Sequence, residues 1–435
     1  MNVKNLEITL LPAQKDELPV PIFRWDLSPT LLAFLAATIG YSLYYVCRLS
    51  LSVMKGPLVE EGLLTEFQLG LVGSALFYTL AAGKLVNGFL ADRVDIRKFA
   101  ATGLLISAAI NLGLGFHVGF YALFALWMIN GWCQSMGAGS FITGLTRLFD
   151  VQVRGTYYGI WSSSHNIGEA LSFLLVSFAV AHAGWRFGWW TAGMLGLTGA
   201  AVIWLFFRTD AARGERAPAV SASVAKAAQI RLLKNPTVWL IALASMLMYI
   251  SRYSINSWGI FFLEKAKGYP IEKASLIVSV SAVCGIVGTV SSGWISDRFF
   301  RGDRAVPTIF AGVLNVLALI VFLMAPAHFV ALSMASMAVF GVTIGALLCY
   351  LGGLMAVDIA GNGAAGAAVG IVGMASYAGA GTQDVISGFL IGAHKVTLSG
   401  QSTYDFLPVS LFWIGSSLLC VLVSVAAWWS NRRAS

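Results

Sequence analysis

The sequence contains few charged residues. Asp, Glu, Lys and Arg make up 11% of its 435 residues, whereas 58% are hydrophobic. Soluble domains average about 25% charged residues, so this composition excludes an ordinary soluble globular protein. Apolar runs of about 18 or more residues recur along the chain, and each can span a hydrocarbon core of about 30 Å. We therefore expect a polytopic membrane protein in contact with a lipid bilayer.

Motifs of several other protein classes are also missing. The five cysteines fall within apolar runs without CxxC or His/Cys spacing, which argues against disulfides and a metal site. No Walker loop or nucleophile elbow occurs, and the GxGxxG match at residues 361–366 follows no predicted strand. We therefore expect neither an enzyme nor a cofactor. The net charge of +8 arises in short loops rather than on one basic face, so nucleic acid is not an expected partner.

Twelve apolar segments fall into two groups of six. We predict an all-α membrane protein of two pseudo-symmetric six-helix bundles, at residues 30–207 and 236–430, with terminal tails at 1–29 and 431–435 and a polar linker at 208–235. The predicted helices occupy residues 30–54, 68–91, 98–117, 120–147, 156–183, 187–207, 236–263, 273–297, 305–325, 328–357, 364–392 and 406–430.

The distribution of Lys and Arg predicts the orientation. If both termini are cytoplasmic, most of the 28 basic residues lie on the cytoplasmic side, as the positive-inside rule expects. The polar N-terminal 29 residues lack the pattern of a signal peptide and are read as a cytoplasmic tail. The basic residues assigned to the outer loops are Lys55, Arg186, Lys265, Lys267, Lys273 and Lys395.

A short internal repeat relates the two halves. The motif GxxxDR closes the second and the eighth predicted helix, at an offset of 205 residues. Glycine permits close helix approach, and the Asp and Arg can pair or cap at the loop, so both loops are candidate conformational-switch elements. The motif residues are Gly88, Asp92 and Arg93 in the first half and Gly293, Asp297 and Arg298 in the second.

Arg48 and Arg252 lie inside apolar segments 204 residues apart, at equivalent places in the two halves. A central arginine costs at least about 2.5–3.5 kcal/mol in a membrane helix, so it rarely persists without a use. The repeat predicts that both side chains approach one point near the midplane. The alternative is a structural arginine paired with an acid on a neighbouring helix, and acids are scarce in these segments.

The residues on the arginine faces suit an anion. Tyr41 and Tyr45 share a helical face with Arg48, and Asn256 shares one with Arg252. The planar guanidinium fork matches the oxygens of a phosphate group and keeps its charge. We predict a site for a phosphate group.

Four further ionisable residues lie within the predicted helices, each with two interpretations. Lys84 attracts the anion or pairs with an acid, Asp384 or Glu169. His165 and Glu169, four residues apart, form a proton-sensitive element, or the histidine is neutral and bound to a neighbouring hydroxyl. Asp384 accepts hydrogen bonds from substrate hydroxyls or locks its helix to a cation.

Several stretches of the chain resemble the major facilitator superfamily. The loop after the second helix follows the superfamily pattern, and five stretches resemble the organophosphate:phosphate antiporters, which include the glycerol-3-phosphate and hexose-phosphate transporters and their sensor relatives. These stretches are Gly40 to Arg48, Gly83 to Gly88, Asn130 to Gln134, Ser164 to Gly168, and Arg252 to Trp258.

The resemblance implies roles for single residues. The chain departs from the family pattern at Glu169, where Gly is usual, at Ser257 before Trp258, and at Asp384. These positions are candidates for selecting the rest of the substrate. By resemblance, Arg48 and Arg252 grip the substrate phosphate, His165 and Lys84 add positive potential, and Tyr41, Tyr45 and Trp161 line the cavity.

The resemblance implies a monomeric secondary transporter of a bacterial inner membrane that exchanges an organic phosphate for inorganic phosphate. A sugar phosphate such as hexose 6-phosphate, or glycerol 3-phosphate, is the expected substrate. One alternative is a membrane sensor that binds hexose phosphate and signals to a kinase. Another is a symporter of a sugar or organic acid, in which His165, Glu169 or Asp384 carries the proton.

Overall fold

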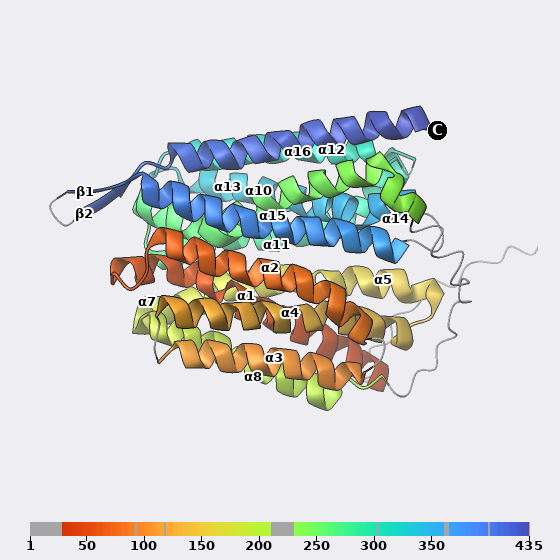
Figure 1. The fold of residues 1–435 in the computed structure, drawn as a ribbon, viewed down its shortest axis with the longest axis horizontal. Coiled ribbons are helices and arrows are strands. Elements are labelled where there is room, and N and C mark those ends of the chain that lie inside the picture. Colours follow the sequence, from red (N-terminus) through yellow and green to blue (C-terminus); the bar gives the residue numbers. More distant parts are fainter. Residues whose placement is uncertain are drawn as a thin grey trace, which may run out of the picture.

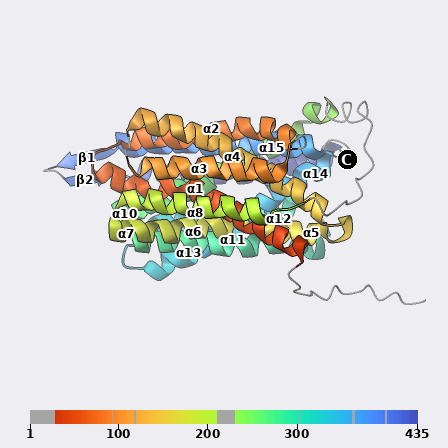
Figure 2. The same cartoon turned by 90° about the horizontal axis from the view of Figure 1, so that it is seen from below.

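A computed structural model describes residues 28–91, 94–116, 119–209, 230–301, 303–360, 365–398 and 401–434. The described helices form twelve spans that run side by side along the length of the molecule (Figure 1). Both α1 and α16 have their terminal ends on one side, which we call the C-terminal end. A short β-hairpin marks the opposite side, which we call the hairpin end (Figures 1 and 2).

The first six spans come before residue 210. The fifth is divided into four consecutive pieces, of which η1 is a π-helix. The elements are α1 (Pro29–Glu60), α2 (Glu66–Ala91), α3 (Ile96–Leu114), α4 (Phe120–Leu148), the fifth span of α5 (Val151–Ser162), α6 (Ser164–Leu171), η1 (Ser172–Val176) and α7 (Ser177–Ala183), and α8 (Trp185–Phe206).

The other six spans follow residue 235. A second π-helix, η2, interrupts the fourth of them. The elements are α10 (Pro236–Lys267), α11 (Ile271–Phe299), α12 (Ala305–Met324), the span of α13 (Val330–Cys349), η2 (Tyr350–Leu354) and α14 (Met355–Ala360), α15 (Ala365–Ala393), and α16 (Leu407–Ala434).

The two central helices begin in the same way. The Ser28 hydroxyl accepts a hydrogen bond from the Leu31 amide at 3.2 Å, and Pro29 occupies the first helical turn of α1. The Asn235 side chain caps α10 likewise, followed by Pro236. Such caps satisfy amides that have no partner within the helix, and proline fits the first turn because it lacks an amide hydrogen. The internal repeat of the two halves therefore includes the capping residue and the proline at the start of each central helix.

Packing also repeats between the halves. Helix α1 packs against α8 as α10 packs against α16, and α2 packs against α4 as α11 packs against α13. Across the halves, α1 meets α10, α2 meets α15, and α11 meets α6. This arrangement places Arg48 on α1 and Arg252 on α10 at the contact between the halves. Eight of the spans in the described ranges are long and apolar enough to cross a membrane.

Three details differ from the sequence-based prediction. Helix α1 continues to Glu60 instead of ending at residue 54, so Lys55 lies inside it rather than in an outer loop. The loop before α16 contains the antiparallel strands β1 (Lys395–Leu398) and β2 (Gln401–Tyr404), so the fold is not entirely α-helical. Residues 431–434, expected as a tail, are helical, and so are residues 230–234 of the expected linker.

Candidate substrate site between the two halves

Arg48 is buried at the contact between the halves, with 4% of its surface exposed. Its Nε donates to the Gln134 side-chain oxygen at 3.2 Å, and its guanidinium carbon lies 4.2 Å from the centre of the Tyr45 ring. Its Nη1 has no hydrogen-bond partner within the described ranges. A buried donor without a partner is costly, so Nη1 of this guanidinium has the capacity for one further hydrogen bond.

Arg252 is equally buried but has an acidic partner. Its Nη2 donates to Oε1 of Glu169, and 3% and 4% of the two side chains are exposed. The expectation that scarce acids would leave the arginines unpaired is wrong for Arg252. In the described structure Glu169 forms no ion pair with His165 or Lys84, because its carboxylate reaches across the contact to α10 instead. Asn256 and Asn166 line a small cavity next to the Glu169–Arg252 pair.

Aromatic rings surround Arg48 on its own side of the contact. The Tyr41 ring stacks on Trp161 with centroids 4.9 Å apart, and it meets Tyr45 edge to face at 5.4 Å. His165 lies next to Tyr45, at 5.9 Å between ring centroids. The buried Nε2 of His165 and Nε1 of Trp161 have no partner in the described part of the chain. Both are nitrogen atoms that a bound polar ligand can satisfy.

Tyr377 on α15 lies among the positively charged side chains, and the sequence did not predict it as a site residue. Lys84 Nζ lies 4.4 Å from the centre of its ring, and the ring is also within electrostatic range of Arg48 and Arg252. Lys84 therefore faces a tyrosine rather than either expected acid. Since no salt bridge to Lys84 occurs in the described ranges, its charge adds to the potential of the two arginines.

Asp384 lies away from these groups, in a buried polar cluster nearer the hairpin end. Its Oδ1 accepts from Lys55 Nζ at 2.9 Å, Ser257 Oγ at 2.6 Å and Trp258 Nε1 at 2.7 Å. The second interpretation of Asp384, a lock on a cation, is therefore the observed one, with Lys55 as the cation. Ser257 belongs to the same cluster, and in the described chain neither Asp384 nor Ser257 bonds to Arg48 or Arg252.

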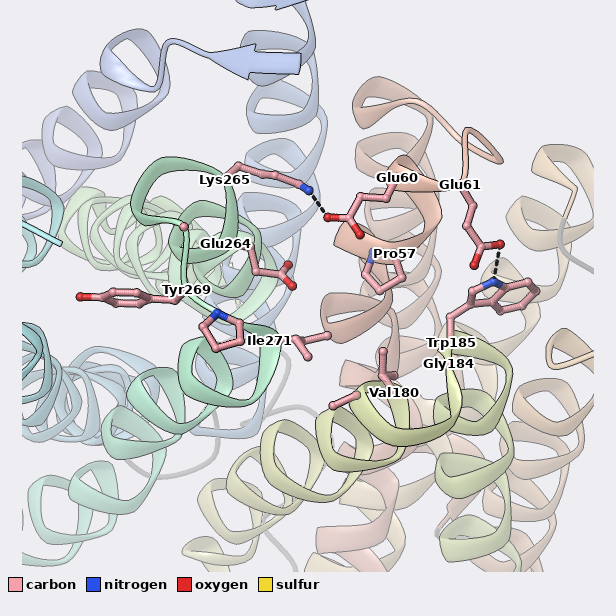
Figure 3. A pocket seen from close by; sticks show the side chains of 13 residues that line it. Pro57, Glu60, Glu61, Val180, Gly184, Trp185, Glu264, Lys265, Tyr269 and Ile271 are labelled. Carbon is pink, nitrogen blue, oxygen red and sulfur yellow. Dashed lines mark hydrogen bonds and ion pairs between the residues drawn. The ribbon is translucent and has the colours of Figure 1, made fainter. Parts of the chain in front are cut away.

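Further pairs join the two halves at the hairpin end. Lys265 on α10 pairs with Glu60 on α1, close to a pocket of about 570 Å³ (Figure 3). Lys395 and Tyr404 on the hairpin both bond to Glu66 on α2, at 2.9 and 2.7 Å. Among the described residues no ion pair joins the halves at the C-terminal end. Apart from the Glu169–Arg252 pair, the described ion pairs between the halves therefore lie towards the hairpin end.

A cavity lies on the other side of the arginines. Its volume is about 290 Å³, and it is lined by both halves. Lys84, Tyr249 and Ser376 contribute the polar groups near the site, whereas Gly352 and Gly366 lie towards the C-terminal end. This cavity therefore lies between the arginines and the C-terminal end, and neither Arg48 nor Arg252 lines it.

The GxxxDR loops are described in part. Gly88 lies in α2, and Asp92 and Arg93 lie outside the described residues. In the second motif, Asp297 pairs with Arg304 at 3.3 Å, and Arg298 is exposed in the last turn of α11. No atom lies within 4 Å of a Cβ placed on Gly293 among the contacts described, so the expected close helix approach is absent there.

The sequence profile of the Major Facilitator Superfamily matches residues 27–382, which is most of the chain. The chain belongs to the major facilitator superfamily. As a superfamily member with long apolar helices, it is an integral multi-pass membrane protein. It belongs to a family of transporters and not of enzymes. The expected fold is confirmed.

Relatives include sensors and transporters. The membrane sensor protein UhpC of Salmonella typhimurium is 29% identical over 361 residues, covering 79% of this chain and 81% of the relative. A probable hexose phosphate transport protein of Chlamydia pneumoniae is 30% identical over 311 residues, 65% and 66% of the two chains. The glycerol-3-phosphate transporter of Bacillus subtilis is 27% identical over 431 residues, 93% of each chain. These relatives agree with the predicted resemblance.

Solved structures of other superfamily members share the fold. A bacterial homolog of the human lysosomal transporter Spinster, in an inward-facing and unoccupied conformation, aligns with a TM-score of 0.76 at 16% identity, over 94% of this chain and 98% of that one. A point mutant of the nucleoside transporter NupG aligns with a TM-score of 0.71 at 17% identity, over 92% and 100%.

Proposed function

We propose that this protein is a secondary transporter that exchanges an organic phosphate for inorganic phosphate. The expected organic substrate is a sugar phosphate such as hexose 6-phosphate, or glycerol 3-phosphate. Relatives described as hexose phosphate and glycerol-3-phosphate transporters support this substrate class. The protein acts as a monomer in a bacterial inner membrane, with its C-terminal end in the cytoplasm.

The observation that carries the proposal is the pair of buried arginines from opposite halves. Among the described residues Nη1 of Arg48 has no partner, and Arg252 lies across the contact on α10. A phosphate group can accept charge-assisted bonds from both forks, and lysine cannot reproduce that geometry. Lys84 adds a third positive charge on the side of the 290 Å³ cavity, which it lines, and its Nζ lies over the Tyr377 ring.

Transport follows from rocking of one half against the other around this site. We infer that this conformation opens towards the C-terminal end, because the ion pairs Lys55–Asp384 and Glu60–Lys265 join the halves on the hairpin side. The opposite conformation requires these pairs to part. A phosphate that bridges Arg48 and Arg252 stabilises the closed intermediate, so transit is favoured in the loaded carrier. Exchange of one anion for another is the expected mode.

The test uses purified protein in proteoliposomes. Vesicles loaded with phosphate should take up labelled glucose 6-phosphate or glycerol 3-phosphate much faster than sulfate-loaded vesicles do. A set of phosphate esters competing with phosphate exchange ranks the substrates. Uptake that needs a proton gradient but no internal phosphate contradicts the proposal and favours a symporter. The ion pairs of Glu169 and Asp384 argue against that alternative, because both acids are already bound to cations.

A sensor of hexose phosphate is the second candidate, because the relatives include the sensor UhpC over most of this chain. The same arginines serve binding in either case. Saturable binding of glucose 6-phosphate without any exchange or uptake in proteoliposomes supports the sensor and contradicts the transporter.

A further inference from the structure

We propose that Glu169 is a tethered stand-in for the substrate phosphate: it occupies Arg252 in the empty protein and is displaced when an anion binds. The inference rests on the proposed site, since it concerns the same arginine. Glu169 thereby sets two quantities: the affinity for phosphate and the ratio of net phosphate transport to phosphate exchange.

The Glu169–Arg252 ion pair joins the two halves in the same way as a bound phosphate would. Glu169 comes from α6 in the first half, and Arg252 comes from α10 in the second. A phosphate that joins Arg48 to Arg252 links the same two halves. The Glu169 carboxylate also lies within electrostatic range of Arg48, whose Nη1 stays unpartnered in the described chain. The carboxylate thus pairs with Arg252 and leaves Nη1 of Arg48, whose Nε bonds to Gln134, as a donor for an incoming anion.

The backbone holds Glu169 close to Arg48. Helix α6 is pressed onto α1 at Gly168, where a Cβ would come within 2.2 Å of the Ser42 carbonyl oxygen. The Ser42 hydroxyl donates to the carbonyl of Ser164 at 2.9 Å, which fixes the start of α6 on the same helix. The π-helix η1 begins three residues after Glu169, and such segments are frequent at functional sites. Side-chain rotation, rather than helix movement, is the expected way for the carboxylate to leave.

The Glu169 carboxylate affects both the binding of phosphate and the return of the empty carrier. Incoming phosphate must compete with Glu169 for Arg252, and it meets a negative carboxylate beside the site, so both effects weaken its binding. The empty protein, in contrast, keeps a bridge between its halves. Glu169 therefore allows some return of the empty carrier, and exchange is favoured but not obligatory.

The first test measures phosphate binding to purified protein in detergent by calorimetry. Glu169→Gln keeps the shape of the side chain but removes the charge. We expect it to bind inorganic phosphate at least about tenfold more tightly, a change of about 1.4 kcal/mol. The control is Asp358→Asn, which removes an acid that pairs with Arg304 outside the site and should leave affinity unchanged. Equal or weaker binding by Glu169→Gln overturns the inference.

The second test compares two rates in phosphate-loaded proteoliposomes. Net efflux of labelled phosphate into anion-free medium reports the return of the empty carrier, and efflux into phosphate medium reports exchange. The wild type should show measurable net efflux, and in Glu169→Gln the ratio of net efflux to exchange should fall about tenfold. An unchanged ratio contradicts the inference.

The binding and transport measurements distinguish a failure of this inference from a failure of the proposed function. If the wild type binds phosphate but exchanges none, the transporter proposal fails and the binding arm still decides the role of Glu169. If Glu169→Gln cannot be purified, Glu169→Asp replaces it, since the shorter side chain weakens the reach to Arg252 and should also tighten phosphate binding. Unchanged affinity in Glu169→Asp then overturns the inference.

Discussion

Lys55 on α1 and Asp384 on α15 form an ion pair of 2.9 Å between Nζ and Oδ1, with 0% and 1% of the two side chains exposed. The Lys55 ammonium also donates to Ser257 and lies 3.7 Å from the centre of the Trp258 ring. This buried cluster joins the halves just beyond the arginines. It joins α1 of the first half to α10 and α15 of the second half on the hairpin side, and it must separate for that end to open.

Lys55→Met should destabilise the protein, because it leaves Asp384 buried without its cation. Removing one partner of a buried pair costs about 3–5 kcal/mol, whereas replacing both with apolar or neutral groups costs far less. Thermal unfolding in detergent should show a lower Tm for Lys55→Met, and Lys55→Met with Asp384→Asn should recover most of it. A double variant as unstable as the single one contradicts the assignment.

Gly70 on α2 supports the same closure. A Cβ at this position would lie 2.5 Å from the Asp384 carbonyl oxygen and 3.1 Å from the Gly388 Cα, so Gly70→Ala pushes α2 and α15 apart. Backbone atoms cannot rotate away, and overpacking of this kind costs about 1–3 kcal/mol. We expect Gly70→Ala to open the hairpin end, measured as faster labelling of a cysteine introduced at Ser257 by an impermeant reagent.

The matched control is Gly113→Ala on α3, where a new Cβ meets no atom within 4 Å among the described contacts. In Gly113→Ala, the cysteine introduced at Ser257 should react with the impermeant reagent at the same rate as in the parent protein. Equal labelling rates in Gly70→Ala and Gly113→Ala would show that the α2–α15 contact does not hold the end closed.

The sequence was sufficient for the fold, and the structure places Arg48 and Arg252 buried at the contact between the halves, while their role in binding stays a prediction. Apolar runs predicted all twelve spans because a membrane helix needs about 20 consecutive apolar residues. The same criterion failed at Lys55, since the prediction ended the helix before the charge. The available signal was its position seven residues after Arg48, which puts both on one helical face.

The pairing of acids and cations could not be predicted. Asp384 and Lys55 are 329 residues apart in sequence, and Glu169 and Arg252 belong to different halves. The scarcity of acids suggested free arginines, but one acid at the contact is enough to occupy Arg252. Tyr377 also escaped notice, because an isolated tyrosine among glycines and alanines carries no periodic pattern and only the packing of α15 on α10 brings it to the site.

Lys84 contributes charge to the site without contacting an acid in the described structure. Lys84→Gln should weaken phosphate binding about three- to tenfold, mostly through the lost potential, and make the remaining affinity less sensitive to salt. Lys98→Gln is the control, because its exposed side chain pairs with Asp95 in the loop before α3. Calorimetric titration with phosphate at two ionic strengths checks both variants. Identical affinity in Lys84→Gln and the parent contradicts a role for this lysine.

The central claim is that Arg48 and Arg252 together hold the phosphate, and homologous phosphate exchange in proteoliposomes tests it most directly. Arg48→Lys and Arg252→Lys keep the charge but lose the planar fork. We predict that each variant, reconstituted at equal density and with a Tm near that of the wild type, loses at least about 90% of exchange, as expected from a loss of about 1.4 kcal/mol or more. Full exchange in either lysine variant would contradict the account.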